Sequence, residues 1–263
     1  MWRRLVSGET GPEVLIVSYP KCGRTWLRVM LGRALCHQFD LDERRLMSTL
    51  ALSRAAALRP TRFVHDGAGG VDGIRWDEQS RDRSLFRGRS VVLLVRDPRD
   101  VMVSSYFQAS RRMGAYAGSL GEFVRDDCFG VRSVLAMYGV WEQSRSVPRD
   151  FLLLRYEDLH RDPAAALCSL LAVMGLMSPD QAAVAAAVHH GAFDRMRELE
   201  RSAGFDEKKL RPGDPTDSES YKVRRGKVGG FVDYLAPGDI AWLEERMREF
   251  GNPFGYPLAV PPA

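Results

Sequence analysis

Three short apolar runs stand out along the chain, and each has the length of a buried strand. They read VLIVS, VVLLV and FLLL and occupy residues 14–18, 91–95 and 151–154. Their apolarity is continuous rather than alternating, which is typical of strands that are covered on both faces of a sheet. Each run leads into a polar turn and then into a helical pattern. This repeat predicts an α/β fold with a central parallel sheet flanked by helices.

Helix signals follow each run and continue toward the C-terminus. One helix is expected from about Thr25, and another after Asp97, a predicted N-cap with Pro98 at the first helical position. Pro163 begins a third. Further helices are expected at residues 182–188, 193–200 and 239–250, and a long functional loop at 211–230. Because ligands bind at the carboxyl ends of parallel strands, the turns after the apolar runs are the expected site.

Composition adds little to this picture. The 263 residues contain no internal repeat and no linker, so a single domain over residues 1–263 is expected. Lysine and arginine total 38 against 34 acidic residues, and a surplus of +4 is too small to predict a nucleic-acid partner. Only five of the 38 are lysine. The excess of arginine suits bidentate recognition of phosphate or sulfate, but codon usage is the favoured explanation.

Cysteine usage and hydropathy favour a cytoplasmic protein. Four cysteines stand far apart in the chain: Cys22, Cys36, Cys128 and Cys168. They lack zinc-ligand spacing and form no disulfide framework, so neither a metal nor an oxidising compartment is expected. The N-terminus lacks the apolar stretch of a signal peptide. The longest uncharged segment, residues 163–179, is shorter than the roughly 18 apolar residues of a spanning helix and is expected to be a core helix.

The turn after the first apolar run has the composition of an anion site. Residues 20–25 (PKCGRT) join the run to a helix N-terminus, where unpaired N–H groups and the helix dipole attract anions. Lys21 adds a charge and Thr25 a hydroxyl. The NTPase signature GxxxxGK[ST] is not met, because Lys21 precedes Gly23 and the first glycine is missing. The loop is therefore P-loop-like without predicting nucleoside triphosphate hydrolysis.

The surrounding stretch, VSYPKCGRTWLRVML, resembles the 5'-phosphosulfate loop of sulfotransferases that use 3'-phosphoadenosine 5'-phosphosulfate (PAPS), which usually reads YPKSGTTW. Cys22 replaces the usual Ser, and Arg24 replaces the first Thr with a cation. The resemblance implies that the donor contacts Lys21, Cys22, Gly23, Arg24, Thr25 and Trp26.

Two later segments strengthen the resemblance. RDPRDVMVSSY, from Arg96, is similar to the family's 3'-phosphate motif RNPRDVAVSYY and implies that Arg96 and Ser104 bind this phosphate. Independently, an Arg at the mouth of a buried strand needs a partner, which is either a phosphate or a carboxylate such as Asp100. VRRGKVGGF, at residues 223–231, is similar to RKGxxGDW, although Gly230-Phe231 replaces Asp-Trp. It implies further 3'-phosphate contacts from Arg224, Arg225 and Gly226.

Weaker matches concern the adenine. Trp26 follows the phosphate loop, and Tyr156 lies in a YEDL segment like the family's. Phe193 and Met196 lie in FDRM, which resembles the adenine-side segment. The resemblance implies that these side chains contact the base, and packing in the core is the alternative for each of them.

The family resemblance also implies a reaction. His65 lies between the first two motifs, where family members carry a His after Lys-Thr, here Phe63-Val64. An imidazole with a pKa near 6.5 can remove the proton of an acceptor hydroxyl at neutral pH. Lys21 would stabilise the bridging oxygen as the sulfuryl group leaves in line, giving 3'-phosphoadenosine 5'-phosphate (PAP) without a metal. The acceptor would be a small molecule.

Two other functions remain open from the residues alone. A nucleotide-dependent kinase would need a magnesium-binding Ser or Thr directly after Lys21, where this chain has Cys22. A catalytically silent nucleotide-binding protein is the other alternative. Residues 46–82 and 111–130 are expected to shape the acceptor pocket, and their composition suits phenols, sugars and lipids alike.

Overall fold

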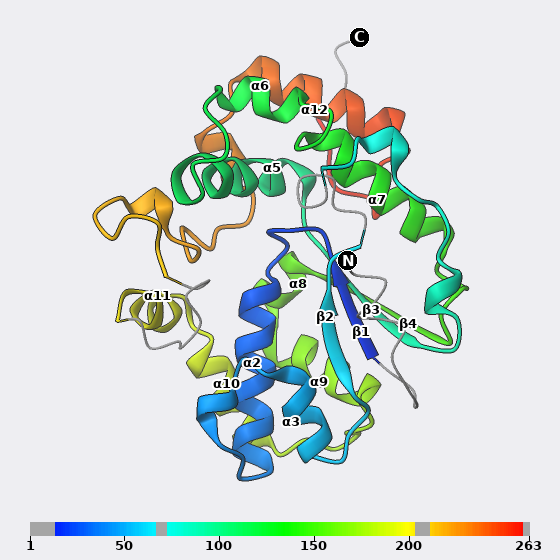
Figure 1. Cartoon of the computed structure of the whole chain (residues 1–263), viewed down its shortest axis with the longest axis vertical. Coiled ribbons are helices and arrows are strands. Elements are labelled where there is room, and N and C mark those ends of the chain that lie inside the picture. Colours follow the sequence, from blue (N-terminus) through cyan, green and yellow to red (C-terminus); the bar gives the residue numbers. More distant parts are fainter. Residues whose placement is uncertain (1–13, 67–72, 203–210, 260–263) are drawn as a thin grey trace.

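Four parallel strands form the central sheet of the protein, in the order β2-β1-β3-β4 (Figure 1). The structure is a computed structural model, and it describes residues 14–66, 73–202 and 211–259. Three strands confirm the apolar runs: β1 (Val14–Ser18), β3 (Ser90–Val95) and β4 (Asp150–Arg155). The two central strands, β1 and β3, are buried along their whole length, as continuous apolarity predicts. β4 is half-buried, because it lies at an edge of the sheet.

The fourth strand, β2 (Thr61–Val64), was not predicted as a strand. It is only four residues long and pairs with β1 in register, with Val64 opposite Val17. Arg62 and Phe63 on this edge strand are half-buried. A short edge strand with a charged residue gives no continuous apolar run, so periodicity alone does not reveal it.

Two groups of helices pack around the sheet (Figure 1). The group at the bottom of the figure is α2 (Arg24–Gln38), α3 (Thr49–Ala55), α8 (Tyr156–Arg161), α9 (Pro163–Val173) and α10 (Gln181–His190). The group at the top is α5 (Pro98–Phe107), α6 (Leu120–Arg125), α7 (Val131–Gln143) and α12 (Pro237–Glu249). A remaining helix, α11 (Phe193–Arg201), lies to one side between the two groups.

The predicted helix starts are confirmed at the atomic level. The Asp97 carboxylate accepts a hydrogen bond from the backbone N–H of Arg99, and Pro98 occupies the first turn of α5. Asp162 caps α9 in the same way, through the N–H of Ala165. At its other end, α5 continues into a π-helical turn, Gln108–Arg112. Such turns are frequent at functional sites.

Candidate active site

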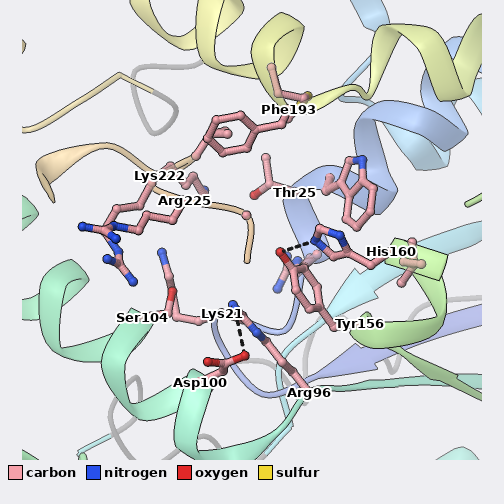
Figure 2. Close-up of a pocket in the computed structure, with 18 of the residues that line it drawn as sticks. Lys21, Thr25, Arg96, Asp100, Ser104, Tyr156, His160, Phe193, Lys222 and Arg225 are labelled. Atoms are coloured by element: carbon pink, nitrogen blue, oxygen red, sulfur yellow. Dashed lines mark hydrogen bonds and ion pairs between the residues drawn. The ribbon is translucent and has the colours of Figure 1, made fainter. Parts of the chain in front are cut away.

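A cavity of about 890 Å³ opens at the carboxyl ends of the strands. Each strand leads directly, or within three residues, to a side chain that lines it: Lys21 after β1, His65 after β2, Arg96 after β3 and Tyr156 after β4. Parallel strands end at the same edge of a sheet, so residues distant in sequence meet there. Figure 2 shows three of these side chains, with Lys21, Arg96 and Tyr156 close together.

The sequence-predicted site residues lie around this cavity, with the exception of Cys22. The lining includes Lys21, Gly23, Arg24, Thr25, Trp26, His65, Arg96, Ser104, Tyr156, Phe193, Met196, Arg224, Arg225 and Gly226. Residues from the three similar motifs thus meet on one surface. The expected acceptor segments contribute Met47 and Met113, in addition to His65.

The phosphate loop turns through two left-handed residues, Lys21 at φ 72° and Gly23 at φ 94°. A Cβ at Gly23 would lie 2.6 Å from Cδ2 of Tyr156, so glycine is needed both for the turn and for the close approach. The Lys21 ammonium donates to Oε1 of Gln108 at 3.0 Å. Its burial, followed by the nearby charge of Lys222, lowers the pKa of Lys21 to about 7. A bound anion would raise that pKa again.

The Cys22 side chain is buried in the core and does not line the cavity, unlike the other residues that the resemblance assigns to the donor. Its Sγ is fully buried and lies 3.4 Å from the Tyr138 hydroxyl. Burial raises the pKa of the Cys22 thiol to about 12, so it is neither a charged nor a reactive group. Any contact between Cys22 and a donor is left to its backbone N–H.

The two residues after Gly23 behave differently. Thr25 lines the cavity near its middle in Figure 2. Arg24 also lines it, but its guanidinium turns toward β2, donates to the Phe63 carbonyl at 3.4 Å and lies 5.8 Å from the Phe63 ring centroid. The Arg24 charge therefore lies toward the strand that carries His65.

Arg96 connects the phosphate loop, residues 20–25, with the C-terminal basic segment, residues 223–231. It donates to the carbonyl oxygens of Lys21 at 3.3 Å and Lys227 at 3.0 Å. Its guanidinium lies 4.1 Å from the Tyr156 ring centroid and pairs with Asp100 at 3.5 Å. The carboxylate partner considered from sequence is thus present. Nε of Arg96 is nevertheless buried with no hydrogen-bond partner in the described part of the chain, so it retains a donor for a ligand.

Asp100 anchors the C-terminal basic segment to α5. Its carboxylate accepts from the backbone N–H groups of Gly229 and Phe231, each at 2.9 Å. Phe231, where the family pattern has Trp, also places its ring 4.3 Å from the Arg99 guanidinium carbon. The departure from Asp-Trp therefore leaves the segment anchored to the start of α5.

The two arginines of this segment are paired with acids. Arg224 donates to Glu219 at 2.9 Å and to the Tyr234 hydroxyl at 2.5 Å. Arg225 is about half exposed and makes only loose ion pairs, with Asp233 at 3.7 Å and Glu219 at 3.9 Å. A phosphate that binds here would compete with these carboxylates.

Aromatic rings line the opposite side of the cavity. The ring centroid of Trp26 lies 5.8 Å from that of Tyr156 and 5.0 Å from that of His160. The Tyr156 hydroxyl and Nε2 of His160 are 3.1 Å apart (Figure 2). Nε1 of Trp26 is buried without a hydrogen-bond partner in the described ranges. A flat polar base would find both ring faces and a donor here.

Phe193 and Met196 differ in exposure. Phe193 is 40% exposed, and a Cβ at Gly226 would lie 2.6 Å from its ring, so this ring covers the basic segment closely. Met196 is 2% exposed and packs with Val29 and Leu46. Core packing, the alternative considered from sequence, therefore describes most of the Met196 side chain.

His65 is oriented by the strand next to it. Its Nδ1 lies 3.0 Å from the Ser18 carbonyl oxygen, which only accepts, so Nδ1 carries the proton and Nε2 is left as the acceptor. Burial first, and then the charge of Arg24, lower the pKa of His65 to about 4, well below the expected 6.5. The ring is therefore neutral at pH 7.

The residue after His65 holds this strand end in place. Asp66 is buried, accepts from Nε1 of Trp141 at 2.9 Å and pairs with Nε of Arg83 at 2.8 Å. A buried, paired carboxylate of this kind rigidifies the backbone around it.

Several lining residues were not predicted from sequence: Arg28, Gln108, His160, Lys222 and Tyr234. Helical spacing gives a signal for two of them. Arg28 lies one turn after Arg24, and Gln108 lies one turn after Ser104. Lys222 directly precedes the basic segment. His160 and Tyr234 have no local signal, because their position depends on tertiary packing.

The structure also bears on metal and membrane binding. In residues 14–66, 73–202 and 211–259, no three His, Cys, Asp or Glu side chains are grouped to hold a metal ion. The helices within these ranges are all too short or too polar to cross a bilayer.

Comparisons by sequence point to one family. The family model of the sulfotransferase domain matches residues 80–251. Cytosolic sulfotransferase 16 of Arabidopsis thaliana is 26% identical over 91% of this chain and 77% of its own length. Sulfotransferase 2A1 of Rattus norvegicus is 32% identical over 72% of this chain and 68% of its own.

Solved structures share the fold. The crystal structure of mouse sulfotransferase SULT7A1 with PAP aligns with a TM-score of 0.60 at 16% identity, covering 94% of this chain and 87% of that one. Retinol dehydratase with retinol and PAP aligns at 0.61 and 16% identity, covering 95% and 84%. The family match over residues 80–251, together with the rat relative, shows that the chain belongs to the sulfotransferase family, enzymes that transfer a sulfuryl group from PAPS to an acceptor.

Proposed function

We propose that the cavity binds PAPS between the phosphate loop and the C-terminal basic segment, and that His65 and Lys21 catalyse sulfuryl transfer to a small hydroxyl compound. The observation that carries this proposal is the meeting of Lys21, His65, Arg96 and Tyr156 at adjacent strand ends around one cavity. PAP in two solved structures of the same fold supports the choice of nucleotide.

The donor's two ends find different partners. Lys21, Thr25 and the N–H groups from Cys22 to Trp26 take the 5'-phosphosulfate, as a helix N-terminus suits an anion. Arg96 and Ser104, with Arg224 to Gly226, take the 3'-phosphate, and the unpartnered Nε of Arg96 suits this role. Trp26, Tyr156, Phe193 and Met196 contact the adenine.

Transfer then follows from two side chains. His65 accepts the acceptor's hydroxyl proton at Nε2 while the acceptor oxygen forms its bond to sulfur. Lys21 stabilises the bridging oxygen as its bond to sulfur breaks and the electron pair remains on that oxygen. The products are PAP and a sulfate ester, and His65 returns the proton to solvent.

The whole chain, 1–263, acts as one domain in this proposal, and the cytoplasm is the proposed location. Relatives named as cytosolic enzymes support the location. A kinase is disfavoured, because Cys22 stands where a magnesium-binding hydroxyl would follow Lys21 and its side chain is buried in the core.

Calorimetry with PAP and AMP tests the nucleotide assignment. PAP should bind at least about tenfold more tightly than AMP, because only PAP carries the 3'-phosphate. Equal affinities would contradict the roles of Arg96, Ser104, Arg224 and Arg225. Transfer of labelled sulfate from PAPS to pooled hydroxyl compounds tests catalysis, and tight PAP binding without any transfer would instead support a silent nucleotide-binding protein.

A further inference from the structure

Three cations of the cavity gather near His65. Arg24 and Arg28 lie on successive turns of α2, and Lys222 comes from the C-terminal loop. The guanidinium carbon of Arg28 lies 4.6 Å from the Phe63 ring centroid, compared with 5.8 Å for Arg24. Phe63 lies on β2, two residues before His65, which directly follows the strand. Both guanidinium groups therefore lie beside the strand that presents the proposed base.

The two arginine charges act on His65, whereas the Lys222 charge acts on both His65 and Lys21. After burial, Arg24, Arg28 and Lys222 are the charges that lower the pKa of His65. For Lys21 the corresponding cations are Lys222, Arg112 and Arg96. Arg24 and Arg28 thus belong to the His65 side of the cavity, and Lys222 lies near enough to affect both His65 and Lys21.

Lys222 has no strong acid partner for its ammonium. Its pKa is lowered to about 8, first by burial and then by Arg112 and Arg28, and Glu200 is the acid that opposes this shift. Glu200 is already engaged, since it pairs with Arg112 at 3.3 Å and accepts the backbone N–H of Lys222 at 2.6 Å. The Lys222 side chain makes no hydrogen bond or ion pair with the residues described in the structure. Figure 2 shows Lys222 across the cavity from Tyr156 and His160.

A neutral acceptor would bring no charge to this region. In the proposed function the side-chain cations that bind the donor's phosphates are Lys21, Arg96, Arg224 and Arg225. The guanidinium groups of Arg24 and Arg28 and the ammonium of Lys222, beside a neutral base, favour a negative ligand there. Met47 and Met113 line the same cavity and offer apolar contact for a carbon skeleton.

We propose that the acceptor is an anionic hydroxyl compound, whose carboxylate, sulfate or phosphate binds Lys222 and Arg28, with Arg24 beside them, while its hydroxyl faces His65. This inference rests on the proposed function and specifies the chemical class of its acceptor. It predicts discrimination between two acceptors that differ in a single charge.

Matched acceptors provide the test. 4-Hydroxyphenylacetate and 6-hydroxyhexanoate would each be compared with the corresponding amide, which has the same skeleton without the charge. In calorimetry on the enzyme–PAP complex, each anion should bind at least about tenfold more tightly than its amide. Turnover with PAPS should show a similar ratio in kcat/KM for any pair that is sulfated.

Variants then assign the preference to its residues. Lys222→Gln and Arg28→Gln should each bring the ratio of anion to amide close to one. Arg161→Gln is the matched control, because Arg161 is an exposed cation on α8 that pairs with Asp158 and lies outside the cavity. It should keep the full ratio.

Three outcomes would overturn the inference: equal binding of anion and amide, binding of neither, or a preference that survives both substitutions. The last result would show that Lys222 and Arg28 do not bind the acceptor's charge. If the protein without substitutions does not bind PAP, the proposed function is overturned. Tight PAP binding with no preference for the anion would overturn this inference alone.

Discussion

The two halves of the site are held in different ways. Lys21, His65, Arg96 and Tyr156 follow strands, so the sheet fixes their backbones. Around His65, the Ser18 carbonyl orients the ring, and the next residue, Asp66, is held by Arg83. The second half is the C-terminal basic segment, residues 223–231, which rests on the first half through Asp100 and Arg96.

This difference suggests separate roles, with catalysis at the strand ends and ligand binding at the basic segment. Strand ends are rigid, so they suit groups that must meet the reacting atoms with little freedom. A loop whose arginines already have acid partners suits a ligand that exchanges those partners, since each new contact replaces an existing ion pair. Substitutions at strand ends should therefore have larger effects than substitutions in the basic segment.

Lys21→Met should have the largest effect. Turnover should fall by about 10²–10³-fold, because the charge on the bridging oxygen loses its stabilising cation, while PAP affinity falls much less. Single-turnover kinetics with PAPS would measure this. Arg201→Gln, which changes an exposed cation on α11, serves as the control. Turnover of the Lys21 variant within fivefold of the parent protein would contradict the assignment.

The pKa of Lys21 adds a dependence on pH. At about 7 in the free protein, this pKa predicts that the kcat/KM for PAPS falls as pH rises through 7, because the deprotonated amine attracts the donor less. Lys21→Met should lose this decline. A flat profile in the parent protein between pH 6 and about 8 would show that Lys21 stays charged without donor.

His65→Ala should have the next largest effect. Turnover should fall by about a hundredfold, with little change in PAP affinity. A general base must be neutral, and with a pKa of about 4 the parent rate should fall only as pH drops below about 5. That acidic limb should disappear in the variant, and acceptors already ionised at neutral pH should be rescued most. Wild-type turnover on an un-ionised alcohol would place the base elsewhere.

Arg96 and Arg225 compare the two halves directly. Arg96→Gln should weaken PAP binding by about tenfold or more, because a buried, charge-assisted contact is lost. Arg225→Gln should weaken it only about two- to fivefold, since its half-exposed guanidinium is screened by solvent. Calorimetry on both variants measures the difference, and the reverse order would overturn the contrast between strand ends and loop.

Two glycines, one in each half of the site, allow the same comparison to be made by protein stability. Gly23→Ala and Gly226→Ala each place a Cβ 2.6 Å from an aromatic ring, at left-handed φ angles of 94° and 59°. Tyr156 is buried and cannot yield, whereas Phe193 is 40% exposed and has room to turn. Denaturant unfolding should show a loss of about 2–3 kcal/mol for Gly23→Ala and about 1 kcal/mol for Gly226→Ala. Equal losses would mean that the two rings are equally fixed.

Much of the fold was accessible from the sequence where apolar patterns are strong. The continuous runs predicted β1, β3 and β4, and Asp97-Pro98 predicted the start of α5. The edge strand β2 had no such signal. α7 was overlooked although its buried residues recur at helical spacing: Val131, Val134, Leu135, Tyr138 and Trp141.

For the site, the sequence indicated many of the residues that line the cavity. It did not indicate which side chains surround each of them. The meeting of the similar motifs around one cavity followed from strands that end at one edge. The direction of the Cys22 thiol depends on Tyr138, and the lowered pKa of His65 depends on burial and on cations from α2 and residue 222. Contacts between such distant residues cannot be inferred from local pattern.

The backbone of Lys21 has an evolutionary consequence. A lysine at φ 72° is less stable than a glycine there by about 1 kcal/mol, and burying its ammonium destabilises the fold further. Replacing it with glycine is therefore a change that a search for thermostable variants would favour and that natural selection for turnover would remove. When heat-resistant variants of this protein are selected without a screen for activity, replacement of Lys21 should be among the first changes to appear.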